Sequence, residues 1–503
     1  MLMYAPLAFI AVGYLVYWYI TRTFNYWKNR NVAYPEPVPL FGNIKDSVLR
    51  KKFIGVVFKE LYDQFPKEKV IGIYRMTTPC ILVRDLDIMK QILIKDFNLF
   101  VDRGVDFSKE GLGANLFHAD GDTWKVLRTK FTPIFTSGKL KNMFPLVSER
   151  ADMFIENMKK ICREKPEQDL QSLSKKYTMS TISACAFGLD IKNDDDTNFA
   201  VLEKLDKLIF KPTYGSELDM MFPGILKKIS SSLFPAEVHA FFNDLVKSIF
   251  EQRKGVPSNR KDFMDLIIEM RQQKIVRANK NVDDSEVSLE LTDSLVAAQA
   301  FVFYAAGFET SSATISFLLY ELSQNRDVQD KLIAEIDETF EKCRETISFD
   351  VLMEMPYLTR VFEETLRKYP IVDPLQRCAQ TDYKIPGTDI TVKKGQIVLF
   401  PVLGIHHDEK YYPNPEVFDP NRFTPENSRD RHPCAYQPFG VGPRNCIGMR
   451  FAKVQSRAFI VKLLSNFRVE ASERTPFKNF DGNRVVMAPD GGMYLNFFSR
   501  QKR

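Results

Sequence analysis

The chain has 503 residues, of which 45% are hydrophobic and 27% are charged, and its formal net charge is +6. This balance is typical of a folded globular protein, and a mild positive charge without a dense run of Lys and Arg argues against nucleic-acid binding. The seven cysteines are widely spaced, which argues against a disulfide framework and against zinc or iron–sulfur sites, because those need clustered thiolates.

The first twenty residues, Met1–Ile20, carry no charged side chain. As a helix they are long enough to span the ~30 Å hydrocarbon core of a bilayer. Trp18 lies at one end, where aromatic rings favour the interface, and Arg22 and Lys28 then keep the rest of the chain on the cytosolic side. A cleaved signal peptide is the alternative, but neither a basic region nor a small-residue cleavage pattern is present. We predict a membrane anchor over residues 1–21, a stiff proline-rich linker over 22–43 and a catalytic body over 44–503.

Helical periodicity dominates the body, so we predict a mainly α fold with a minor β region. Apolar residues at i, i+3 and i+4 predict helices over Ala151–Cys162, Ala236–Arg253, Asp293–Asn325, Val328–Phe340 and Met449–Phe467. Short strands are expected over Cys80–Val83 and Gly395–Phe400. The apolar stretch Asp219–Leu233, which Pro223 and Gly224 interrupt, fits either the core or a patch that dips into the membrane surface.

One loop near the C-terminus carries a cysteine among glycines. Residues 439–448 read Phe-Gly-Val-Gly-Pro-Arg-Asn-Cys-Ile-Gly. Glycines let the backbone pass close to a flat ligand, where a Cβ would clash. Cys446 lies at the start of a predicted helix, where the helix dipole favours a thiolate, and Arg444 can reach an anionic group on the ligand. A buried cysteine in a glycine-rich turn is the alternative interpretation.

This loop resembles the cytochrome P-450 superfamily signature, Phe-x-x-Gly-x-Arg-x-Cys-x-Gly, at all of its positions. A chance match in a chain of this length is on the order of one in ten thousand. The resemblance implies the cytochrome P-450 fold, haem b as cofactor and Cys446 as the axial ligand of the iron, with Phe439 and Arg444 beside the haem. Such a thiolate favours O–O cleavage. Phe135–Lys139 and Ala305–Ser311 look most like the insect xenobiotic-metabolising members of the microsomal class.

The family also joins a Glu-x-x-Arg pair to an arginine from a Pro-x-Arg-Phe segment. Three such pairs occur here: Glu341–Arg344, Glu364–Arg367 and Glu426–Arg429. Only Glu364–Arg367 lies in a helical pattern at the family's place, and its spacing puts both side chains on one helix face. Pro420–Phe423 supplies Arg422, although the family often has an acid where Asn421 stands. The resemblance implies a structural role for Glu364, Arg367 and Arg422.

The long predicted helix contains Ala306-Gly-Phe-Glu-Thr310, which matches the family's Ala-Gly-x-Glu-Thr. Gly307 inside a helix costs about 1 kcal/mol relative to Ala, and Thr310 can donate to the carbonyl of residue 306 and bend the helix. An ordinary kinked core helix is the alternative. In the family the kink forms an oxygen pocket and the acid and the alcohol supply protons there, so the resemblance implies catalytic roles for Glu309 and Thr310.

The resemblance further implies cations that bind the haem propionates and a small set of pocket residues. The propionate set is Arg103, Trp124 with Arg128 at i, i+4 on a helix, Arg377 and Arg444, although each arginine taken alone is more often a surface charge. The substrate pocket would include Val302, Ala305, Ala306, Val372 and Leu375. None of the five histidines carries a motif, which disfavours a histidine-ligated haem.

The function implied is a monooxygenase at the endoplasmic reticulum membrane that inserts one oxygen atom from O₂ into an apolar small molecule, a xenobiotic such as an insecticide or a plant toxin. Electrons would come from NADPH through a membrane-bound flavoprotein reductase, with cytochrome b5 as a further partner, because the chain has no nucleotide-binding glycine motif. The alternatives are an endogenous lipid or steroid hydroxylase, a haem-thiolate isomerase or dehydratase, and a non-enzymatic haem-binding sensor or carrier. The Glu309–Thr310 pair argues against the isomerase.

Overall fold

Helices dominate the computed structural model, which describes residues 5–105, 107, 109–189, 197–260, 262–272, 275–279, 286–343 and 347–500. The helices are α1 (Ala5–Thr21), α2 (Lys45–Val48), α3 (Ile54–Gln64), α4 (Leu86–Lys90), α5 (Gly121–Phe131), α6 (Ser137–Glu164), α7 (Leu170–Phe187), α8 (Thr197–Phe210), α9 (Gly215–Met221), α10 (Ile225–Lys228), α11 (Ala236–Gln252), α12 (Phe263–Arg271), α13 (Asp293–Gln324), α14 (Arg326–Lys342), α15 (Phe349–Glu354), α16 (Pro356–Lys368), α17 (Val402–His406), α18 (Pro425–Ser428) and α19 (Met449–Asn466). Single 3-10 turns cover Lys28–Arg30, Phe97–Leu99, Gly111–Ala114, Thr132–Phe135 and Pro420–Phe423, and a π-helical turn covers Gln91–Lys95.

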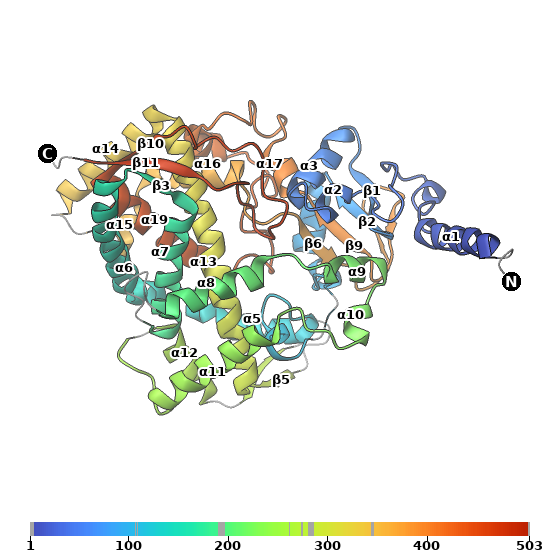
Figure 1. Cartoon of the computed structure of the whole chain (residues 1–503), viewed down its shortest axis with the longest axis horizontal. Helices are drawn as coiled ribbons and strands as arrows, with labels where there is room; N and C mark the ends of the chain where they lie inside the picture. Colours follow the sequence, from blue (N-terminus) through green and yellow to red (C-terminus); the bar gives the residue numbers. More distant parts are fainter. Residues whose placement is uncertain are drawn as a thin grey trace.

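The strands form small sheets. They are β1 (Val70–Arg75), β2 (Thr78–Val83), β3 (Glu167–Asp169), β4 (Ile275–Asn279), β5 (Glu286–Glu290), β6 (Leu375–Cys378), β7 (Tyr383–Lys384), β8 (Thr391–Val392), β9 (Ile397–Phe400), β10 (Phe467–Ala471) and β11 (Tyr494–Ser499). The largest sheet among the described residues has the order β1-β2-β9-β6, in which β2 and β9 run parallel and the outer pairs run antiparallel. Figure 1 shows this sheet on the N-terminal side of the molecule, apart from most of the helices. The mainly α prediction is confirmed.

The long helix α13 is the core element that positions the site. The Thr292 hydroxyl caps it by accepting from the backbone N–H of Leu295 at 3.2 Å. It is buried on nearly all faces, as expected of a helix that is apolar all round. It packs against α7, α11, α16 and α19, and it runs through the middle of the molecule (Figure 1).

Sequence periodicity located most of the longer helices it was applied to. The expected helices Ala236–Arg253, Asp293–Asn325 and Met449–Phe467 each end within one residue of the observed ends. The expected helix Ala151–Cys162 is confirmed as helical but is part of a longer helix, because α6 begins at Ser137 and continues through Pro145 to Glu164. A proline inside a helix removes one hydrogen bond and interrupts the pattern without always ending the helix.

The N-terminal segment has an exposed helix followed by a docked linker. In α1 the side chains of Phe9, Ile10 and Tyr14 are 80%, 68% and 68% exposed, and Figure 1 shows the helix extending away from the body. Over the part of the chain that the structure describes, no helix combines the length and the apolar character that crossing a membrane requires. The linker contacts the sheet, because Trp27 is fully buried and its indole N–H donates to Ile73 O at 3.0 Å.

The apolar stretch 219–233 forms part of α9 and α10 rather than a continuous core segment. Gly224 provides the break between the two helices with a φ of +79°. Leu226 is buried, whereas Phe222 and Ile229 are exposed. The Phe222 ring stacks on Tyr19 of α1 with centroids 5.9 Å apart. The exposed side chains of this stretch therefore continue the apolar surface of α1.

Candidate active site

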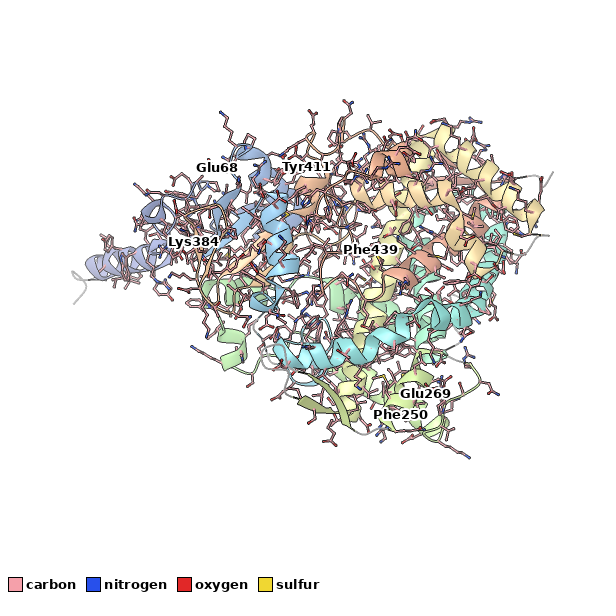
Figure 2. All side chains as sticks on the ribbon, turned by 180° about the vertical axis from the view of Figure 1, so that it is seen from behind. Glu68, Phe250, Glu269, Lys384, Tyr411 and Phe439 are labelled. Carbon is pink, nitrogen blue, oxygen red and sulfur yellow. The ribbon has the colours of Figure 1, made fainter. Side chains whose placement is uncertain are left out.

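Cys446 lies in a tight loop that leads into α19. The Cys446 N–H donates to Phe439 O at 2.8 Å and closes the loop. Gly442 has a φ of +75°, and a Cβ at this position would lie 2.0 Å from Leu93 O. This close approach requires glycine. The half-buried Phe439 packs against the main core and lies at the centre of the view in Figure 2.

Opposing interactions act on the pKa of the Cys446 thiol. Burial raises the pKa of the thiol, while the Gly448 N–H and the guanidinium groups of Arg128 and Arg103 act to lower that pKa. Cys446 nevertheless keeps accessible surface. A donor and two cations are therefore in place to stabilise a thiolate once a metal displaces the proton.

Two predicted residues of α5, Trp124 and Arg128, contact the cysteine loop. Arg128 donates to Asn445 O at 2.8 Å and to Asn445 Oδ1 at 2.7 Å. The guanidinium of Arg444 lies 4.5 Å from the centroid of the buried Trp124 ring, and it donates to Ala119 O at 2.7 Å. Sequence reasoning missed Asn445, although its place beside Cys446 in the loop was a usable signal.

The arginines near the loop form a cluster with too few counter-charges. Burial lowers the pKa of Arg377 to about 9, and burial with repulsion from Arg103 and Arg377 lowers that of Arg444 to about 8. The Nε atoms of Arg377 and Arg444 are buried without a hydrogen-bond acceptor in the described residues. The carboxylate of Asp102 is 4.0 Å from Arg444. Because desolvated, mutually repelling cations need anions, this cluster fits the two propionates of haem b.

The predicted pocket residues differ in exposure, and one of them lies close to the cysteine loop. Ala306 of α13 is exposed and Val302 is half-buried, whereas Ala305 is buried. Leu375, at the start of β6, has its Cδ1 3.8 Å from the Cβ position of Gly440 in the cysteine loop. Val372, just after α16, is 40% exposed.

Glu309 and Thr310 are neighbours in sequence but have different partners. Thr310 Oγ1 donates to Ala306 O at 2.8 Å, as the sequence predicted. The buried carboxylate of Glu309 instead lies 3.0 Å from Lys175 Nζ of α7 and 3.7 Å from an Arg484 nitrogen. Burial is the main cause that raises the pKa of Glu309. Neither cation has a motif in the sequence that could have indicated this contact.

Gly307 lies where α7 approaches α13. A Cβ at this position would be 2.9 Å from Cδ1 and 3.2 Å from Cγ1 of Ile182. The glycine therefore allows two helices to pack closely, which is a sufficient structural reason for its cost inside a helix.

The structure brings Glu364, Arg367 and Arg422 together. Two hydrogen bonds of 2.7 and 2.8 Å join Arg367 to Glu364, and both side chains are fully buried. Arg422 Nε lies 3.4 Å from Glu364 Oε1, which also accepts from the backbone N–H of Asp419 at 2.9 Å. Of the other two pairs, Arg344 lies outside the described residues and Glu426 is exposed.

A histidine that carried no motif links this group to the cysteine loop. His406 Nδ1 lies 3.1 Å from Arg367 O, and the backbone N–H of Gln437 donates to His406 Nε2 at 3.0 Å. Nε2 must accept, so Nδ1 carries the proton and donates. Gln437 lies two residues before Phe439 at the start of the loop. The Glu364–Arg367 pair thus supports the loop through backbone groups.

Comparison with known proteins gives one family. A family model described as Cytochrome P450 matches residues 32–497. Cytochrome P450 6B1 of Papilio polyxenes is 56% identical over 489 residues, which cover 97% of each chain. Cytochrome P450 6B2 of Helicoverpa armigera is 54% identical over 504 residues, which cover 99% of each chain. Cytochrome P450 6a2 of Drosophila melanogaster is 37% identical over 505 residues, which cover 97% of each chain.

Proposed function

Because this chain belongs to the cytochrome P450 family, we propose that Cys446 ligates the iron and that the substrate is an apolar foreign compound, such as a plant toxin or an insecticide. The enzyme is a haem-thiolate monooxygenase with haem b as cofactor. The observation that carries the site assignment is the Cys446 loop, whose thiol has the Gly448 N–H and two guanidinium groups nearby. The substrate class rests on the likeness of Phe135–Lys139 and Ala305–Ser311 to insect xenobiotic-metabolising members.

The roles of the surrounding residues follow from their contacts. When bound, haem b activates O₂ so that one oxygen atom enters the substrate and the other leaves as water. Arg377 and Arg444 would hold the propionates, and Arg128 fixes the loop that presents the sulfur. The Thr310 hydroxyl can donate a proton on the face of α13 where Ala306 is exposed, and Glu309 is the nearest acid in sequence that can resupply it.

The family needs O₂ and a redox partner. We propose an NADPH-dependent flavoprotein reductase as that partner, with cytochrome b5 as a second electron donor. We also propose that residues 1–21 anchor the enzyme in the endoplasmic reticulum membrane, with α9 and α10 against the lipid surface. Exposed apolar side chains on α1 and the stacked Tyr19 and Phe222 rings support this arrangement. A chain lacking residues 1–21 should bind membranes more weakly than the full chain, and equal binding would contradict the anchor.

The substrate proposal is tested with the full chain, the reductase and NADPH in membranes. A panel of plant toxins, insecticides, fatty acids and steroids is incubated under isotopically labelled O₂. We expect NADPH-dependent loss of apolar foreign compounds, with one labelled oxygen atom in each product. Oxidation confined to steroids or fatty acids would replace the substrate class. Rearrangement of a peroxide without NADPH would indicate an isomerase instead.

A further inference from the structure

Asp373 is a buried acid in the segment that joins α16 to β6, and it lies between two of the predicted pocket residues, Val372 and Leu375. Only 4% of Asp373 is exposed. Its Oδ1 accepts from the backbone N–H of Val402 at 2.5 Å and from that of Leu403 at 3.3 Å. These are the first two residues of α17, so the two hydrogen bonds hold the carboxylate on the end of that helix.

The other carboxylate oxygen of Asp373 faces α3. Oδ2 is buried and has no hydrogen-bond donor among the described residues. A Cβ on Gly55 of α3 would lie 2.8 Å from Oδ2 and 3.1 Å from the Cβ of Asp373, so glycine leaves the space that the carboxylate occupies. Helix α17 packs against α3, and the two lie side by side in Figure 1. The carboxylate is therefore held between a helix that binds it and a helix that limits its position.

The buried carboxylate is an expensive way to join two helices. Burial raises the pKa of Asp373 to about 7, although the two N–H groups act to lower that pKa. An apolar side chain of similar size would avoid this cost. A buried polar group can instead fix one arrangement where apolar packing would allow several. We therefore look for what the arrangement of this segment determines.

Hydrogen bonds also fix both ends of the segment that contains Asp373. The carbonyl oxygen of Ile371 accepts from the Met487 N–H at 3.0 Å. The Gln376 side chain donates to Arg103 O at 2.7 Å. The carboxylate of Asp373 thus holds the middle of a short segment whose two ends are already in place.

Two neighbours of Asp373 face the space beside the cysteine loop. Val372 is adjacent to Asp373 and is 40% exposed. Leu375 is two residues further on, and its Cδ1 lies 3.8 Å from the Cβ position of Gly440. A displacement of the Asp373 backbone would therefore move both predicted pocket residues.

We propose that Asp373 is a positioning residue that determines which carbon of an apolar substrate is oxidised, because its carboxylate fixes the placement of Val372 and Leu375. The inference rests on the proposed oxygenation site at Cys446 and on the pocket role of these two residues. The carboxylate acts through the backbone that it ties to α17. A misplacement of about 1 Å can cost ~10²-fold in rate, so a smaller shift is enough to change which carbon reacts.

The experiment measures a product ratio in the haem-loaded full chain with reductase in excess. The probe is n-butylbenzene, an apolar foreign compound whose benzylic, inner-chain and terminal carbons give separable alcohols. A ratio does not depend on the active fraction of the protein, so a partial loss of folding or of haem leaves it unchanged. Asp373→Ala removes the tie, and we expect its ratio of benzylic to terminal alcohol to differ from that of the wild type by about threefold to tenfold.

The conservative variant separates positioning from mere filling of space. In Asp373→Asn the amide oxygen can still accept from the N–H groups of Val402 and Leu403. Its amide nitrogen takes the buried place of Oδ2, which should lower the stability of the protein because a buried N–H needs an acceptor. The product ratio should nevertheless stay close to that of the wild type. A ratio like that of Asp373→Ala would overturn the role of the two hydrogen bonds.

Two glycine variants test the same tie from the helices on either side. Gly55→Ala places a methyl group 2.8 Å from Asp373 Oδ2, so it should displace the carboxylate and change the product ratio. The matched control is Gly404→Ala in α17, whose Cβ would instead meet Tyr62 of α3 at 2.9 Å. Both changes overpack the same pair of helices and should lower stability, but the control should keep the wild-type ratio. In the Asp373→Ala background, Gly55→Ala should change the ratio no further.

A second readout does not depend on turnover. Hydrogen exchange of the holoenzyme, followed by mass spectrometry, reports on the backbone amides of Val402 and Leu403. Exchange there should be faster in Asp373→Ala than in the wild type or in Asp373→Asn, because only the alanine variant lacks the acceptor. Faster exchange with an unchanged product ratio would overturn the positioning role and leave Asp373 a structural tie.

The outcomes separate this inference from the proposed function. If the wild type oxidises no carbon of n-butylbenzene, the apolar substrate class fails and the inference fails with it. If the wild type oxidises the probe and both Asp373→Ala and Gly55→Ala keep its product ratio, the role of Asp373 is overturned while the oxygenation site at Cys446 stands. If Asp373→Ala does not fold, the comparison of Gly55→Ala with Gly404→Ala decides.

Discussion

Glu364→Ala removes the carboxylate of the buried group that supports the cysteine loop. Glu364 binds Arg367 through two short hydrogen bonds in a fully buried position, and it also contacts Arg422 and the Asp419 N–H. The change leaves the Arg367 guanidinium buried without its carboxylate, which costs about 3–5 kcal/mol. Whole proteins are stable by only about 5–15 kcal/mol. We therefore expect the variant to lose most of its stability and to fail to retain haem.

Two measurements check this expectation: the haem content per chain, from absorbance, and the urea midpoint of unfolding. Arg367→Ala should behave like Glu364→Ala, because each leaves a fully buried charge without its closest partner. The matched control is Glu426→Ala, which removes the acid of another Glu-x-x-Arg pair at an exposed position and should change neither quantity. A stable, haem-loaded Glu364→Ala or Arg367→Ala protein would refute the reasoning.

Three further perturbations probe the site. Thr310→Ala should keep haem, but product formed per NADPH consumed should fall by ~10²-fold or more unless a water replaces the hydroxyl, and peroxide should rise. Unchanged coupling would limit Thr310 to shaping the helix. Gly442→Ala should lower haem content more than Gly440→Ala, since both have positive φ but only a Cβ at Gly442 meets a backbone oxygen, at 2.0 Å; equal losses would contradict this. The third perturbation is a fall in pH. Burial lowers the pKa of His118, His406 and His407 to about 3, so their contribution to the free energy of unfolding is full above about pH 6.5 and is lost as the pH falls. The carboxyl of Asp373, whose pKa burial raises to about 7, acts in the opposite sense but offsets only one of the three imidazoles. Urea midpoints that stay constant below about pH 6 would contradict this expectation.

Sequence patterns predicted the features that interactions between residues close in sequence determine. The ends of α13 follow from a capping threonine and a long apolar run, and the Thr310 bond to Ala306 follows from helix geometry. The extent of α6 shows the limit, since the helix runs from Ser137 through Pro145 to Glu164, well beyond the expected Ala151–Cys162.

The contacts that sequence reasoning missed join segments far apart in the chain. Lys175, Asp206 and Arg484 come from α7, α8 and the segment before β11, and none of them has a neighbouring residue that marks it. His406 likewise depends on the distance between two loops rather than on a motif. Such contacts arise from tertiary packing, which periodicity and spacing do not encode.

The central claim is that Cys446 is the thiolate ligand of the haem iron. The most direct test is the absorption spectrum of the reduced carbon monoxide complex of Cys446→Ser, beside Cys434→Ser as the matched control. Cys434 is buried, and burial raises the pKa of its thiol to about 11, whereas a backbone N–H and two guanidinium groups act against burial at Cys446. We predict that Cys446→Ser loses the red-shifted Soret band typical of a thiolate ligand and that Cys434→Ser keeps it. A Cys446→Ser protein that retains this band, while Cys434→Ser loses it, would contradict the assignment.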